Sequence, residues 1–228
     1  METFDELKEI CRRACHERNA CKEGFEALMQ AESIGGILAV WRKNWHDVYK
    51  SKYADVMADN IVGVYARMGD EFRRSEVYVN ESSERGLVII CRPTARICLG
   101  GTAKGYIFGT DAEVEATDNA QVYCRTAGVM ISLLGHAYCS CENREAVVAV
   151  RNFAQAHGEM QCHTWNAAQV VITNGTLCDH GHRRISAYGG ARIYSDATKG
   201  IELGGQARQY PLAEYPADNN DNENDNTL

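Results

Sequence analysis

Residues 157–182 contain the best candidate for a metal site in the chain of 228 residues. The run CDHGH places one thiol and two imidazoles at alternate positions, at Cys178, His180 and His182. In an extended strand these side chains share one face, and a neighbouring segment can bring His163 beside them. Mixed nitrogen and sulfur donors suit Zn²⁺. The sequence therefore marks these four residues as a candidate zinc site, beside the interpretation that they form a turn carrying ordinary surface histidines.

A second group of potential ligands lies near the N-terminus, at Cys11, Cys15, His16 and Cys21. Cysteines four residues apart on a helix can chelate a metal ion, but the group lacks the paired CxxC spacing of zinc fingers. Buried cysteine acting as a small hydrophobic residue is the commoner case. We therefore interpret these cysteines as core residues.

Arg183, Arg184 and Arg192 are candidate ligand-binding residues, because a guanidinium group pairs well with phosphate or carboxylate. Solvated arginines on a strand surface explain them equally well. The chain has no GxGxxG or GxxxxGK phosphate-binding loop and no GxSxG nucleophile elbow. Its Gly-Gly pairs are more simply turns. The motifs therefore assign no catalytic residue.

The elements that position these residues change character along the chain. Residues 2–74 show apolar residues at intervals of three and four, which predicts four short amphipathic helices packed as a bundle. The two tryptophans of WRKNW fit core positions in the third helix. We expect a helical module over residues 1–80, a β-solenoid over 85–210 and a disordered acidic tail over 211–228, DNNDNENDNTL being its polar end.

Apolar and polar residues alternate through residues 87–209, which indicates short strands. The clearest units have small apolar residues at three alternate positions and begin at residues 112, 120, 127 and 135. Ala, Cys and Val fill a narrow interior, and short repeats with a narrow core favour stacked coils. Two or three strands in each coil would give roughly five to seven coils at about 4.8 Å spacing. An antiparallel β-sandwich or jelly roll with short strands is the alternative.

Charge and cysteine content restrict the class of protein. The net charge of −7 is concentrated in residues 1–84 and in the tail, and the repeat region is nearly neutral. A basic nucleic-acid-binding face is therefore not expected. The chain also lacks an apolar run of the roughly 20 residues that a membrane span needs. Because residues 1–18 do not resemble a signal peptide, we expect a cytoplasmic protein whose ten cysteines are reduced.

Two resemblances point to an origin. The A-x-V-x-A units separated by Gly, Asn or Asp resemble repeats of poorly characterised bacterial and phage proteins expected to be β-solenoids. NACKEGFEAL, with the later NWHDVY, resembles a helical "AC-x-EG" module near the N-termini of phage and mobile-element proteins. A third resemblance, to left-handed β-helix acyltransferases, implies His136 or His157 as a general base. Those enzymes have six-residue repeats, whereas the units here step by seven or eight.

These observations favour a non-catalytic binding protein of phage or mobile-element type. We expect a protein partner, such as a component of a host defence system, or sequestration of a small nucleotide. The helical module would dock or form a homo-oligomer. Direct nucleic-acid binding and membrane insertion are not expected, and no cofactor is required, with zinc as the possible exception. The alternatives are a trimeric β-helix transferase, a metal-dependent enzyme using the Cys/His cluster, and a self-assembling structural element.

Overall fold

Four helices form the N-terminal part of the chain in the computed structural model, which describes residues 2–16, 22–50, 54–91, 93 and 95–216. They are α1 (Glu2–His16), α2 (Lys22–Gln30), α3 (Ile34–Tyr49) and α4 (Ala54–Arg74). Ser33 caps α3 by accepting a hydrogen bond from the backbone N–H of Gly36 at 3.1 Å. No helix in the described ranges has the length and apolar character needed to cross a membrane.

The tryptophans of α3 anchor the helices, as predicted. Trp41 and Trp45 are each 1% exposed, and their ring centroids lie 5.1 Å apart. Trp41 meets Phe72 of α4 edge-on and donates its indole N–H to Sγ of Cys11 at 3.2 Å. Cys11 is therefore a core residue, whereas the side chains of Cys15, His16 and Cys21 lie outside the described part of the structure.

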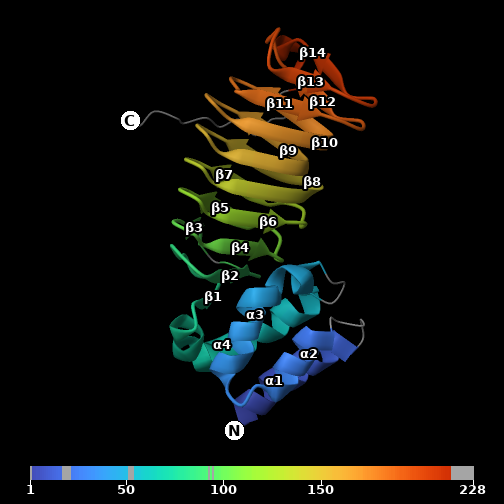
Figure 1. Cartoon of the computed structure of the whole chain (residues 1–228). Helices are drawn as coiled ribbons and strands as arrows, with labels where there is room; N and C mark the ends of the chain where they lie inside the picture. The colour runs from blue at the N-terminus through green and yellow to red at the C-terminus, as the bar shows by residue number, and fades with distance from the viewer. Residues whose placement is uncertain (1, 17–21, 51–53, 92, 94, 217–228) are drawn as a thin grey trace.

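The rest of the chain is a solenoid of parallel strands stacked away from the helices (Figure 1). The strands are β1 (Val77–Val79), β2 (Leu87–Ile90), β3 (Ile97–Leu99), β4 (Lys104–Ile107), β5 (Glu113–Ala116), β6 (Gln121–Cys124), β7 (Met130–Leu133), β8 (Tyr138–Val150), β9 (Gln155–Thr164), β10 (Gln169–Asp179), β11 (Arg184–Ala187), β12 (Arg192–Tyr194), β13 (Ile201–Leu203) and β14 (Arg208–Tyr210). A 3₁₀ turn, η1 (Leu212–Glu214), follows. Every pairing is parallel, which distinguishes this solenoid from the antiparallel sandwich considered as the alternative.

Each coil contributes one strand segment to each of two faces. The first face follows β1, β2, β4 and β6, then the first halves of β8, β9 and β10, then β11 and β13. The second face follows β3, β5 and β7, then the second halves of the same long strands, then β12 and β14. The described residues thus form about eight two-sided coils, more than the five to seven expected.

The coil length is regular at first and then contracts. Val88 pairs with Gly105, Gly105 with Val122, and Val122 with Cys139, so successive partners are 17 residues apart. Ala156 then pairs with Val170, only 14 residues later. The contraction follows from the corners of β9 and β10, where one continuous strand turns through a register shift instead of a loop.

The predicted strand units have the correct phase, but two of them begin two residues too early. Val129 and Ile131 are buried, whereas Gly128 has a positive φ of 69° and completes the preceding turn. Ala137 and Cys139 are buried, and Gly135 is likewise a corner residue, with φ of 65°. Glycine adopts the positive φ that these corners require because it has no Cβ.

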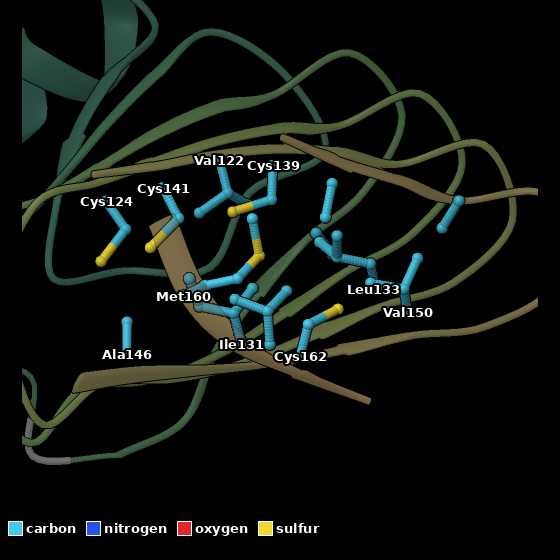
Figure 2. Packing of buried hydrophobic residues seen from close by; sticks show 14 of the residues in the cluster. Val122, Cys124, Ile131, Leu133, Cys139, Cys141, Ala146, Val150, Met160 and Cys162 are labelled. Atoms are coloured by element: carbon cyan, nitrogen blue, oxygen red, sulfur yellow. The ribbon is translucent and has the colours of Figure 1, made fainter. Parts of the chain in front are cut away.

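Small and sulfur-bearing side chains fill the interior of the coils (Figure 2). Cys124, Cys139, Cys141, Met160 and Cys162 lie in this core. None of the cysteines in the described ranges forms a disulfide bond with another described cysteine. Burial raises the pKa of the Cys162 thiol well above its ordinary value. These cysteines therefore act as packing residues.

The helices cover the first coils from outside. On β2, Val88 and Ile90 face the solenoid interior, whereas Leu87 and Ile89 join the helical core. Tyr106 of β4 joins the same core, and its ring lies 5.1 Å from that of Tyr49 in α3. This end of the solenoid is thereby closed by a second hydrophobic core.

Candidate metal centre

Three of the four predicted metal ligands come together on the second face of the solenoid. Parallel pairing places Cys178 of β10 beside His163 of β9. Leu177 points into the core, so Cys178, the next residue, points outward. His180 follows the end of β10, with its Nε2 atom 3.4 Å from Sγ of Cys178. One donor atom from each of the three residues lies within 4.8 Å of the other two.

The fourth predicted ligand, His182, does not join this group. Strand β10 ends at Asp179, and Gly181 turns the chain with a φ of 150°. The His182 ring therefore meets Asp179, with Nδ1 2.8 Å from Oδ2, and its Nε2 lies 3.2 Å from the backbone oxygen of Lys199. The predicted shared face is correct for residues 178 and 180 and wrong for residue 182.

Asp179 is the centre of a buried hydrogen-bond network beside the three donors. Its Oδ1 accepts bonds from the hydroxyl of Thr164 and the backbone N–H of Gly181, both at 2.9 Å. Its Oδ2 accepts a bond from the Ser195 hydroxyl and contacts His182. Burial opposes ionisation of Asp179, but the hydrogen bonds from Ser195 and Thr164 outweigh it and hold its pKa below the ordinary value. The network fixes the turn that carries His180.

An aromatic cluster surrounds the donors. The ring of Trp165 is stacked on His180, with centroids 5.0 Å apart and planes within 13°. The guanidinium group of Arg151 lies over the same indole at 4.9 Å. Beyond η1, the chain returns to this face and places the Tyr215 hydroxyl 3.4 Å from Nε2 of His163. The half-buried Trp165 and Tyr215 were not among the predicted site residues.

The donor set is chemically suited to a soft or borderline cation. Zn–S bonds near 2.3 Å and Zn–N bonds near 2.0–2.1 Å put tetrahedral ligand atoms roughly 3.3–3.6 Å apart. The spacing of Cys178 and His180 already meets this value. The His163 donor lies within 4.8 Å of the other two, so it would have to approach by at most about 1.5 Å. A water molecule would then complete the tetrahedron.

The predicted arginine group is dispersed. Arg184 lies on the first face, where its Nη2 donates to Oε2 of Glu202 at 3.0 Å, and Arg183 precedes it in the same corner. Arg192 lies on β12, on the second face. These residues therefore do not form one anion site. His136 and His157 are also apart from the donors: His136 stacks on Phe153 at a corner, and His157 lies on the first face.

No protein-family model, curated protein or solved structure matches this chain. The geometry of the site is therefore the basis for a functional assignment.

Proposed function

We propose that the chain is a metal-binding interaction protein that holds one zinc ion between neighbouring coils and presents the surrounding aromatic surface to a protein partner. The observation that carries the proposal is the convergence of His163, Cys178 and His180 within 4.8 Å. Two imidazole nitrogens and a thiolate are typical zinc ligands. A zinc ion here would join two coils, so its role is primarily structural.

The aromatic surface supports the interaction role. Trp165, Tyr210 and Tyr215 remain half-buried on the second face, alongside Arg151. Aromatic residues and arginine are enriched among the residues that dominate protein interfaces. The resemblance of the N-terminal module to those of phage and mobile-element proteins makes a host defence component the partner that we propose.

Metal content of the purified chain tests the proposal directly. Native mass spectrometry should show one zinc ion on the wild type, and Cys178→Ser and His180→Ala should abolish it. Replacement of zinc by Co²⁺ should produce a thiolate-to-metal charge-transfer band that Cys178→Ser removes. Cys98→Ser is the matched thiol control, because Cys98 is exposed and lies outside the group of three donors.

The histidine control is His157→Ala, which removes an exposed imidazole from the opposite face. Both control variants should keep one zinc ion per chain. A wild-type protein that stays metal-free after equilibration with zinc would refute the proposal. Equal zinc binding by wild type and Cys178→Ser would refute it as well.

A metal-dependent hydrolase is the second candidate, because three protein ligands leave a coordination position for water. This candidate predicts that partner binding survives His180→Ala while turnover of a substrate is lost. The structural role predicts that partner binding itself weakens when the metal is absent.

A further inference from the structure

A second site lies at the other end of the molecule, where α3 meets the first coils. A cleft of about 490 Å³ opens there between helix α3, the chain before β2 and the turn before β4. Its volume is within the usual range of small-molecule sites, roughly 300–1,000 Å³. The lining residues are far apart in sequence, within 42–46, at Glu76, within 85–87 and within 102–106.

The charge of this cleft is opposite to that of the protein. Its walls carry the cationic side chains of Arg42, Lys43, Arg85 and Lys104 against one carboxylate, that of Glu76. The chain as a whole has a net charge of −7, and residues 1–84 hold more acids than bases. Glu76 engages Arg42 at 2.7 Å and Arg85 at 3.4 Å. Lys43 and Lys104 add two positive charges to this group of Glu76 and two arginines, so the lining has a net positive charge. A concentrated positive potential attracts anions.

Two residues of the cleft lining each carry a buried nitrogen atom that has no hydrogen-bond partner among the described residues. Nε1 of Trp45 and Nδ1 of His46 have no hydrogen bond within the described residues. Trp45 is 1% exposed, and both residues line the cleft. An indole N–H can only donate, so its natural complement is an oxygen acceptor. Buried polar groups are normally satisfied, so a side-chain movement that exposes these atoms to water or to a ligand oxygen in the cleft would be favourable.

We propose that this cleft binds a small phosphorylated ligand of mononucleotide size. Arg42, Arg85 and the two lysines would neutralise the phosphate oxygens, as charge-assisted hydrogen bonds do in other phosphate sites. The exposed hydroxyl of Thr102 would supply a neutral contact. The lysines lie on different elements, Lys43 on α3 and Lys104 on β4, so the ligand would bridge the helices and the solenoid.

Isothermal titration calorimetry on the full chain tests the site with ADP, inorganic pyrophosphate and adenosine as probes. The wild type should bind ADP or pyrophosphate, and adenosine should bind at least about tenfold more weakly. Tighter binding of ADP than of pyrophosphate assigns a nucleotide, and equal binding assigns the phosphate groups alone. Lys43→Glu and Lys104→Glu should each weaken binding by about tenfold or more.

Lys199→Glu is the matched control, because it makes the same charge change on an exposed lysine beyond β12. It should leave the affinity within about twofold of wild type. The proposal is overturned if no phosphate-bearing probe binds, if adenosine binds as well as ADP, or if both lysine variants bind like wild type. Cys178→Ser should keep the phosphate affinity, so this test and the zinc test fail independently.

Discussion

Asp179→Asn removes the charge at the centre of the buried network with little change in side-chain volume. The substitution replaces one carboxylate oxygen by an NH₂ group, which donates and cannot accept. In the wild type each carboxylate oxygen faces two partners: Thr164 and Gly181 on one side, Ser195 and His182 on the other. Whichever way the amide is oriented, one of these pairs meets a donor where it had an acceptor.

The cost follows from the burial of the site. The Asp179 side chain is 3% exposed and that of His182 is 5% exposed, so water cannot replace the lost acceptor. A buried donor left unsatisfied costs about 1–3 kcal/mol, and two donors lose their acceptor here. We expect the free energy of unfolding to fall by about 3 kcal/mol. For a chain of this size that corresponds to a Tm lowered by about 6–12 °C.

Thermal unfolding followed by circular dichroism measures the loss, and hydrogen exchange locates it. In a solenoid each coil contacts only its neighbours, so protection should fall in β10, β11 and β12 while β4 and β6 keep theirs. Asp118→Asn is the control: Asp118 is an exposed corner aspartate that accepts from the N–H of Gly101 at 3.2 Å. Its effect should stay within about 0.5 kcal/mol. An equally small effect for Asp179→Asn would refute the reasoning.

Two further predictions concern backbone geometry and alkaline stability. Gly158 has a φ of 123°, and an added Cβ would lie 1.8 Å from a backbone oxygen, whereas nothing lies within 4 Å of one at Gly24. Gly158→Ala should therefore destabilise the protein by more than about 1 kcal/mol, and Gly24→Ala, in helix α2, should stabilise it by about 0.5–1 kcal/mol in urea unfolding. Burial, and then the negative charge of the nearby Glu81, raises the pKa of Tyr65 to about 12. The folded state thus keeps a proton that the unfolded state loses near pH 10, so stability should fall as pH rises above about 10, and Tyr65→Phe should reduce this slope. An unchanged slope in that variant, or the same sign of effect for both glycine variants, would contradict these expectations.

The solenoid could be predicted from the sequence because the side-chain period of two is a local property. The repeat units that begin with the buried Ala112 and Ala120 alternate small inward residues with polar outward ones, and β5 and β6 form where these units predicted strands. The next two units were placed two residues too early. Gly135 is a corner residue in the same phase as the inward Ala137 and Cys139, and Ala127 precedes the corner at Gly128. The predicted number of coils was too low, because the corners of β9 and β10 contain no loop and so leave no signal in the sequence.

The two candidate sites differ in how much local sequence reveals. Cys178 and His180 share a face because they are two residues apart on one strand, and this follows from strand geometry alone. Tyr215 reaches His163 only because the chain after β14 folds back, 52 residues away in sequence. The cationic cleft could not be predicted from local sequence, because Lys43 and Lys104 are brought together by the packing of a helix on a sheet.

The position of the two sites along the solenoid decides how they can be interpreted. The cleft belongs to the first two coils, through β2 and β4, and the metal ligands belong to β9 and β10. At about 4.8 Å per coil, three to five coils separate them, or roughly 15–25 Å. No described element spans that interval except the coils themselves (Figure 1). Any energetic coupling between a phosphate ligand and the zinc ion would therefore have to be transmitted through the intervening coils. Each coil contacts only the coils next to it. We therefore expect the binding free energies of the two ligands to be additive, with each ligand raising the unfolding temperature of its own end of the solenoid.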